Sequence, residues 1–387
     1  MKKPSQIVDE CFRPAAEHIM STSAQALASS GDERAAVFHQ YAMFAERQYH
    51  AISRSPDALR WKLYVDRKKE EIKQRKRQMD RLPQATAEYQ SLVKEQSRAQ
   101  ALLKGDMERS KEHLSQRTSF LASAVEMYSR CLAASDKFDE DSPIRLCSLW
   151  LANFDNDDPA LRFGPALELV PSRKFVFLAH QLTARLSQSD NDQPTHNQEA
   201  LQDLIKRMGS EHPFHSLFPL YCLKGDRTPS QASSLSRRQS GRFGTPAPSQ
   251  IERAAAVSDL FDKLRCDPRA GKRIRAIERV CDASLEWAKF PIKHLFTRGS
   301  KMSSSLPLPD HVLLRKIKDV QVPVITAPTA IDPTTEYRDC VWISHFEEHY
   351  STAGGVNLPK IVRCIGSNGK TYKQLVRCGG LPFLVRY

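Results

Sequence analysis

In the first 225 residues, apolar side chains recur at helical spacing. Val37, Tyr41 and Phe44 form one stripe, and a second stripe runs beside it through Phe38, Ala42, Ala45 and Tyr49. Stripes at i, i+4 and i+7 predict a helix that packs on more than one side. Ser30, three residues before Glu33, has the pattern of a capping box and predicts where this helix begins.

The next segment is long, charged and thin in apolar residues. Trp61 to Met79 is strongly charged, Pro83 interrupts the pattern, and helical spacing resumes from Glu88 to Cys131. Long polar helices separated by short breaks predict an antiparallel helical array, in which each pair buries a narrow face. No sequence period is present, so this solenoid interpretation depends on helix content and not on repeats.

Apolar residues become denser further along the chain. Three segments predict buried helices, at residues 144–151, 175–182 and 212–218. Residues 228–250 are instead rich in Ser, Arg, Pro and Gly, and a segment of this kind buries too little apolar surface to offset the entropy of ordering. We therefore expect a disordered loop there, and helix again from Ile251 to about Phe290.

From Val322 onward the pattern is typical of strands. Residues 322–331 and 340–346 are rich in β-branched and aromatic residues, after a Ser- and Pro-rich linker at 303–309. Two short strands are expected at 360–365 and 371–377. They flank Gly366-Ser-Asn-Gly369, and Asn-Gly between apolar segments is the strongest short signal for a hairpin.

Composition narrows the classes of partner. The chain has 58 basic and 45 acidic residues, a net charge of +13. This balance favours acidic partners, but no basic motif with interleaved aromatic residues is present, so a direct DNA contact stays open. The basic run from Arg67 to Arg77 fits a solvated helix face better than a nuclear-import signal or a DNA-contacting stripe. No apolar run is long enough to cross a membrane.

The nine cysteines include no Cys-x-x-Cys pair. With no signal peptide at the start, this pattern predicts reduced thiols inside a cell. Most of the cysteines lie among apolar neighbours, where a thiol behaves as a small hydrophobic side chain.

Four blocks of sequence, in this order, carry a family resemblance: Arg145–Leu151, Glu211–Phe218, Val280–Ala283 and Ala353–Ile361, the last followed by Gly366–Lys370 and Gln374–Val376. They resemble the ataxia-telangiectasia-mutated type of phosphoinositide 3-kinase-related protein kinases, a branch that includes the fungal telomere-maintenance kinases. The resemblance implies a mainly α fold, with an α-solenoid of FAT-type helical repeats followed by a short, incomplete β-rich kinase N-lobe.

The same resemblance implies a domain organisation. The expected ranges are 1–190 for the end of the FAT-type scaffold, 191–225 for its continuation, 226–250 for a disordered loop, 251–300 for the final scaffold helices, 301–319 for a linker, 320–377 for a truncated kinase N-lobe and 378–387 for a divergent tail.

Candidate binding residues lie in the last block. Main-chain N–H groups approach phosphates most closely where residues lack a Cβ atom, and phosphoryl transfer depends mainly on positioning and charge stabilisation. The expected phosphate loop runs from Tyr350 to Asn357, and Gly354, Gly355, Val356 and Asn357 are its expected binding residues.

Three further positions are assigned by resemblance. Pro359 and Leu375 would line an adenine pocket, although packing inside a small sheet explains them equally well. The family's nucleotide-binding lysine follows Gln-Leu-Val, and this chain has Arg377 at that place. Arginine is a planar fork and lysine a compact point charge, so this exchange is not conservative.

After Arg377 the sequence departs from the family pattern and ends at Tyr387. The catalytic loop, the Mg²⁺-binding aspartate and the activation loop are expected beyond that point. We therefore expect no catalytic and no metal-binding residue in this chain, and no phosphate transfer by the chain alone. We interpret the divergent tail as a sign that the chain is a fragment, or that the gene model or the splicing is in error.

The resemblance also implies a function for the full-length protein. Members are nuclear serine/threonine kinases that act at chromosomes and telomeres. With ATP and Mg²⁺ they phosphorylate protein substrates at Ser or Thr before Gln. They receive the damage signal from a DNA double-strand-break sensor complex, and the resting enzyme is a homodimer. The alternative is a non-catalytic α-helical interaction scaffold whose last 60 residues cap the array.

Two other motifs compete with this interpretation. His345-Phe-Glu-Glu-His349 matches the His-x-x-Glu-His pattern of zinc proteases, but that chemistry needs both histidines on one helix face and this segment follows a predicted strand. His212, His215 and Cys222 fall short of four tetrahedral ligands, so packing at a helix N-terminus is favoured over a metal site. Ser-Gln dipeptides at 230–231 and 249–250 are as frequent as chance predicts.

Overall fold

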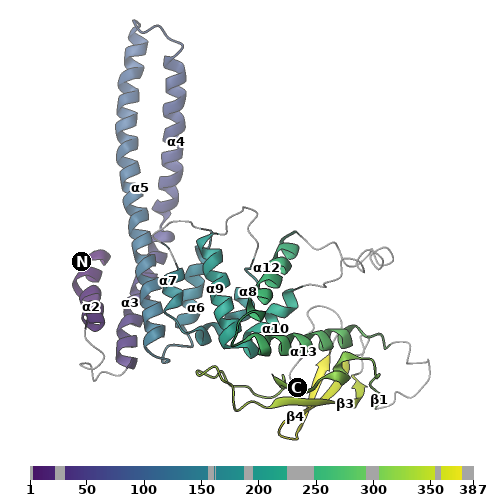
Figure 1. The fold of residues 1–387 in the computed structure, drawn as a ribbon. Coiled ribbons are helices and arrows are strands. Elements are labelled where there is room, and N and C mark those ends of the chain that lie inside the picture. Colours follow the sequence, from purple (N-terminus) through teal and green to yellow (C-terminus); the bar gives the residue numbers. More distant parts are fainter. Residues whose placement is uncertain are drawn as a thin grey trace. The chain divides into compact units, whose positions relative to one another are not determined.

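A computed structural model describes residues 3–21, 31–155, 161, 163–186, 195–224, 248–292, 305–353 and 359–376, without the side chains of 57–62 and 248–251. These residues form helices followed by an antiparallel sheet of five strands, which confirms the predicted fold class (Figure 1). Contacts divide the chain into two compact units, Met1–Val170 and Pro171–Tyr387. The finer domain ranges that the resemblance implies stay predictions.

The first unit is helical. It contains α1 (Pro4–Ile7), a π-helical turn η1 (Val8–Phe12), α2 (Arg13–Ser21), α3 (Gly31–Ser53), α4 (Pro56–Met79), α5 (Ala87–Ala134), α6 (Ser142–Ala152) and α7 (Gly164–Glu168). In α3 the second predicted stripe is fully buried, and from the first stripe Tyr41 is buried while Val37 and Phe44 are half-buried. Burial of both stripes confirms a helix packed on more than one side. Ser30, the predicted cap, lies outside the described residues.

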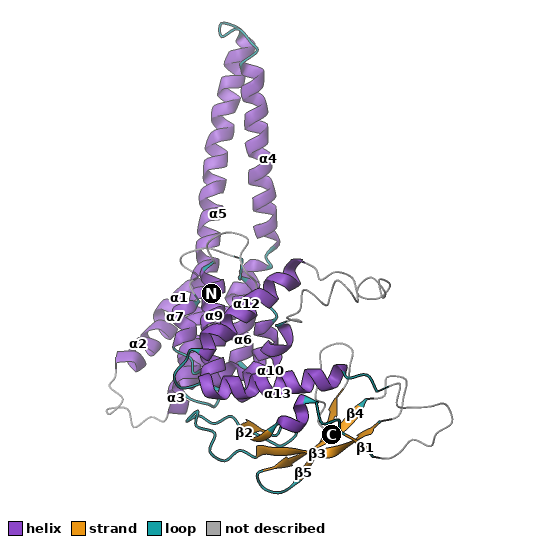
Figure 2. Cartoon of the chain, turned by 45° about the vertical axis from the view of Figure 1, so that its right-hand side comes forward, coloured by secondary structure: helices purple, strands orange, loops and turns teal. Residues whose placement is uncertain are grey.

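The charged segment forms a long antiparallel pair, α4 and α5, which Figure 2 shows side by side. Pro83 lies in the turn between them, as predicted, and the Thr86 hydroxyl caps α5 by accepting from the Tyr89 N–H at 3.3 Å. Between residues 66 and 119, all of which are described, Gln96 alone is buried. Polar contacts in this stretch include the Lys68–Asp106 ion pair at 2.8 Å.

A buried polar cluster joins α3, α5 and α6 at the base of this pair. The Glu46 carboxylate accepts a hydrogen bond from the Tyr128 hydroxyl at 2.6 Å and one from the Arg145 guanidinium at 3.0 Å. Arg145 also binds Asp141 at 2.8 Å. Burial, and then the Glu46 carboxylate, raise the pKa of the Tyr128 hydroxyl, which therefore stays a protonated donor.

The helices of the second unit depart from prediction at two points. The helix expected at 175–182 is a 3₁₀ turn η3 (Ser172–Leu178) followed by a short α8 (Ala179–Thr183). The turn starts where the Pro171 carbonyl accepts from the Lys174 N–H, three residues on, at 3.1 Å. Then come α9 (His196–Glu211) and α10 (Pro213–Leu223), the latter as expected.

The helix expected from 251 to 290 is two helices, α12 (Pro248–Arg265) and α13 (Gly271–Lys289). Asp267 separates them, because its carboxylate accepts from the Arg269 and Ala270 N–H groups at 2.8 and 3.2 Å and Pro268 follows it. Residues 248–250, predicted as loop, are helical, whereas residues 225–247 lie outside the described part.

The sheet contains β1 (Leu306–Pro307), β2 (Lys318–Pro323), β3 (Trp342–Thr352), β4 (Lys360–Gly366) and β5 (Thr371–Val376), with a 3₁₀ turn η5 (Leu313–Lys316) before β2. The order is β1-β3-β4-β5, and β2 pairs with the same edge of β3 as β1 does. Part of the predicted linker is therefore strand. Residues 324–331, predicted as strand, are not, because the Ala327 N–H turns back to the Val324 carbonyl at 2.8 Å and Pro328 follows.

The hairpin between β4 and β5 is confirmed. The Gly369 N–H donates to the Gly366 carbonyl and the Gly366 N–H to the Lys370 carbonyl, each at 2.9 Å. Gly369 has φ of +75°, a conformation that favours glycine. In this turn positive φ falls on the glycine and not on Asn368, so the turn is wider than the two-residue form that Asn-Gly usually makes.

Candidate functional site

The predicted phosphate loop, Tyr350 to Asn357, starts too early, because Tyr350 to Thr352 still pair with β4 as the last residues of β3; the rest of it belongs to the connection from β3 to β4. The Ala353 N–H donates to the Pro359 carbonyl at 2.8 Å, which joins the two ends of the connection directly after the Thr352–Lys360 pair of the ladder. Gly354, Gly355, Val356 and Asn357 themselves lie outside the described residues, so their assignment stays a prediction. The structure does fix the place at which this five-residue connection leaves the sheet.

The other predicted binding residues lie around the same sheet end. Leu375 pairs with Ile361 in the β4–β5 ladder, and the last described pair is Lys360 with Val376. Because side chains alternate along a strand, Leu375 and Ile361 lie on the sheet face opposite to Lys360. Leu375 is buried, Pro359 half-buried, and Arg377 lies outside the described residues. The adenine-pocket and the packing interpretations of Pro359 and Leu375 both stay open.

Lys360, which sequence reasoning used only as the start of a strand, has the most unusual environment of this region. Its side chain is 4% exposed. Its ammonium group donates to the main-chain carbonyls of Trp287, of Ala288 at 3.1 Å and of Phe290 at 2.6 Å, all at the C-terminal end of α13. The signal in the sequence was a lysine at the start of a strand whose alternate positions Val362 and Cys364 are apolar and buried.

Aromatic rings enclose this ammonium. Its nitrogen lies 4.8 Å from the centre of the Trp287 ring and 6.0 Å from that of Phe290. Trp287 also meets the Tyr350 ring of β3 edge-on, with centroids 4.8 Å apart. Trp287 and Tyr350 are fully buried, so α13 is fixed to the sheet by rings as well as by Lys360; Figures 1 and 2 show α13 along one face of the sheet.

Histidines at the start of α10 hold the long β2–β3 connection. Tyr337, 1% exposed, has its hydroxyl 2.7 Å from His212 Nδ1 and 3.2 Å from His215 Nδ1. His215 Nε2 lies 3.1 Å from the Thr329 carbonyl and therefore carries the proton of the neutral ring, which leaves its Nδ1 to accept. The histidines thus pack at a helix N-terminus, as predicted, where both contact Tyr337.

The rejected zinc motif lies on β3. His345 and His349 belong to an eleven-residue strand and not to a helix, so they cannot share the helix face that zinc-protease chemistry requires. Among the residues that the structure describes, no group of three or more His, Cys, Asp or Glu side chains is arranged to hold a metal ion. Nor does the described part of the chain include a helix with the length and apolarity needed to span a membrane.

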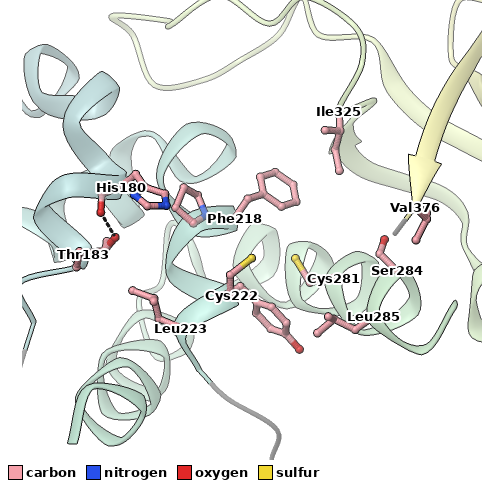
Figure 3. A pocket seen from close by; sticks show the side chains of 13 residues that line it. His180, Thr183, Phe218, Cys222, Leu223, Cys281, Ser284, Leu285, Ile325 and Val376 are labelled. Atoms are coloured by element: carbon pink, nitrogen blue, oxygen red, sulfur yellow. Dashed lines mark hydrogen bonds between the residues drawn. The ribbon is translucent and has the colours of Figure 1, made fainter. Parts of the chain in front are cut away.

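An apolar pocket of about 200 Å³ lies between α8, α10 and α13 and reaches Val376 at the end of β5 (Figure 3). His180, Phe218, Leu285 and Ile325 contribute to its lining. Two thiols, Cys222 and Cys281, also line it, and burial raises the pKa of both. Protonated thiols are poor nucleophiles, so neither Cys222 nor Cys281 is activated for nucleophilic attack.

The chain has a helical scaffold followed by a small antiparallel sheet, and its sequence has a glycine pair in the β3–β4 connection. This is the arrangement of a FAT region that leads into a kinase N-lobe. No family model matches the chain. Individual proteins do match. The serine/threonine-protein kinase TEL1 of Cryptococcus neoformans is 30% identical over 350 residues, which are 89% of this chain and 11% of that protein. The serine-protein kinase ATM of Sus scrofa is 32% identical over 268 residues, 67% of this chain and 8% of its own length.

Solved structures agree in fold. The chain matches the open conformation of CtTel1 with a TM-score of 0.74 and 24% identity, over 98% of this chain and 13% of that one. It matches the FAT and kinase domain of CtTel1 with a TM-score of 0.70 and 22% identity, over 98% of this chain and 23% of that one. The chain therefore belongs to the Tel1/ATM family of serine/threonine protein kinases. It spans about a tenth of the length of these two curated relatives.

Proposed function

We propose that this chain is the segment of a DNA-damage checkpoint and telomere-maintenance kinase in which the helical scaffold meets the nucleotide-binding lobe. The observation that carries the proposal is the glycine pair at 354–355, set in a connection whose ends are joined by the Ala353–Pro359 hydrogen bond. Relatives that are serine/threonine protein kinases support it. The scaffold-only alternative has no such support.

ATP is the proposed ligand, and the described residues fit part of it. Ile361 and Leu375 give the sheet an apolar strip on the face away from α13, of the kind that an adenine ring contacts. Main-chain N–H groups of the loop at 354–358 would bind the phosphates, which requires positions without a Cβ atom. Bound ATP would supply the γ-phosphoryl group of the family reaction.

Mg²⁺ is different, because the described residues offer no cluster that could hold it. We assign no Mg²⁺ ligand and no catalytic residue to this chain. Its own contribution is to bind and orient the nucleotide.

The family resemblance extends the proposal to the whole protein. It would phosphorylate Ser or Thr before Gln in protein substrates in the nucleus, respond to a double-strand-break sensor complex and rest as a homodimer. A complete CtTel1 dimer with C2 symmetry, which this chain matches in fold with a TM-score of 0.72, supports the dimer.

A chimera tests the proposal. Residues 1–376 are continued with the kinase-domain sequence that follows the aligned position in the Cryptococcus neoformans TEL1 relative. The chimera is expected to bind Mg-ATP saturably and to phosphorylate a Ser-Gln peptide. Gly354→Val with Gly355→Val should weaken Mg-ATP binding by about tenfold or more, since a side chain fills the space of the phosphate oxygens.

Gly369→Ala is the matched control, because it changes a glycine at the opposite end of β4 and should leave the affinity unchanged. A folded chimera that binds no ATP at millimolar concentration would contradict the proposal and favour the non-catalytic scaffold. The unextended 387-residue chain is expected to show no ATP turnover.

A further inference from the structure

The environment of the Lys360 ammonium is built for one charged group. Burying a charge is costly unless hydrogen bonds replace its hydration. An ammonium has three N–H donors, and Lys360 directs them to three carbonyls, those of Trp287, Ala288 and Phe290. The last carbonyls of a helix lack the N–H partners of the regular helix, although the Trp287 carbonyl also accepts from the Phe290 N–H at 3.2 Å, and the helix dipole makes that end negative. The end of α13 thus satisfies the cation, and the cation satisfies the end of α13.

The backbone of Lys360 lies between the two segments that are predicted to contact phosphates. On one side it pairs with Thr352 of β3, directly before the connection closed by Ala353 and Pro359. On the other side it pairs with Val376 of β5, directly before position 377. Ends of sheets open more readily than their centres, and here one buried side chain holds the end of three strands.

We propose that Lys360 is a positioning residue for the nucleotide phosphates, an inference that rests on the proposed function. Its ammonium fixes the end of β3, β4 and β5 to α13, so the loop at 354–358 and residue 377 both start from a rigid point. The lysine does not touch the nucleotide. It acts through the main chain, where a displacement of about 1 Å is enough to reduce phosphoryl-transfer rates strongly.

Hydrogen exchange on the 387-residue protein tests the structural step. Lys360→Met keeps the aliphatic stem and removes the ammonium. The exposed Lys373 of β5 provides the matched control, Lys373→Met. In Lys360→Met the amide of Ala353, which bonds to Pro359, should exchange about tenfold faster, while the amide of Gly369 at the opposite end of the sheet keeps its rate. Equal acceleration at both amides, or none at Ala353, would overturn the inference.

Lys360→Arg keeps the test decisive if the methionine variant does not fold. A planar guanidinium keeps the charge but cannot present three donors in the arrangement of an ammonium. Its effect on Ala353 should therefore be smaller than that of methionine, and still absent at Gly369. An arginine variant identical to the wild type at Ala353 would count against a site built for lysine.

Nucleotide binding by the chimera tests the positioning role. Lys360→Met should weaken Mg-ATP binding by about tenfold and adenosine binding by much less, since the change acts on the phosphate contacts. A general loss of stability would weaken both ligands alike, and that result would overturn the positioning role. If the wild-type chimera binds no ATP, the proposed function fails instead, whatever the exchange data show for Lys360.

Discussion

Removing the Glu46 side chain should destabilise the first unit strongly, because it accepts from a buried hydroxyl. In Glu46→Ala the Tyr128 hydroxyl, in a fully buried side chain, loses the acceptor 2.6 Å away. An unsatisfied buried hydroxyl costs about 1–3 kcal/mol. The Arg145 contact adds about 1 kcal/mol, since the arginine is 36% exposed and keeps its contact with Asp141.

Loss of the buried Cγ methylene of Glu46 adds about 1 kcal/mol. The sum is about 3–5 kcal/mol. Glu46→Gln keeps an acceptor for Tyr128 and should cost less than half as much. In a Tyr128→Phe background the alanine change should also cost less, because the hydroxyl is already absent.

Urea-dependent hydrogen exchange of residues 120–132 in α5 measures this free energy, since their slowest amides report unfolding of the unit. Glu126→Ala is the matched control. Its carboxylate is 51% exposed and binds Arg130 on the same helix at 2.9 Å, which is worth at most about 0.5 kcal/mol. If Glu46→Ala lies within about 1 kcal/mol of Glu126→Ala, the cluster does not stabilise the unit as argued.

Three further outcomes are expected. Burial lowers the pKa of His212 below its ordinary value of 6.5. As pH falls, His212 is therefore protonated in the unfolded chain before it is protonated in the folded one. The free energy of unfolding from urea titrations should fall between about pH 7.5 and 5.5, and it should fall less in His212→Gln. Burial raises the pKa of the Cys364 thiol to about 12, so this thiol should resist alkylation at neutral pH. Mass spectrometry should find Cys364 unmodified and the exposed Cys11 modified, and equal labelling of the two would contradict this. Gly369→Ala should destabilise by about 1 kcal/mol because φ is +75°, whereas Gly105→Ala inside α5, where no atom lies within 4 Å of the added Cβ, should stabilise by about 0.5–1 kcal/mol in thermal melts.

Long periodic patterns predicted the fold well. The stripes around Tyr41, the charged segment broken at Pro83 and the Asn-Gly hairpin all correspond to elements of the structure. The stripe and the charged segment each rest on many residues, and the breaks at Pro83 and Asn-Gly fall where two such patterns end. Prediction was wrong where one residue decides the outcome, as at Asp267, whose side chain ends one helix and starts the next. It was also wrong at 324–331, where β-branched composition indicated a strand but Pro328 and a turn prevented one.

The sequence indicated which residues to consider for the candidate site, but not which side chains and carbonyls surround them. The glycine pair marks the connection between β3 and β4, yet nothing local to Lys360 indicates that its partners lie about 70 residues earlier, at the end of α13. Contacts between distant segments are set by tertiary packing, which periodicity does not encode. A lysine in line with the apolar, buried positions of a strand is the type of exception that a sequence pattern can flag but not explain.

The thin interior of the α4–α5 pair has an evolutionary consequence. Gln96 is the one buried residue between 66 and 119. That stretch therefore has almost no close side-chain packing that a change in length would disrupt. Matching helical turns can be inserted into or deleted from both α4 and α5 without disturbing the cluster at Glu46. Each turn changes the length of the pair by about 5.4 Å. Among orthologues, the lengths of α4 and α5 should therefore differ far more than the lengths of the other helices of this unit.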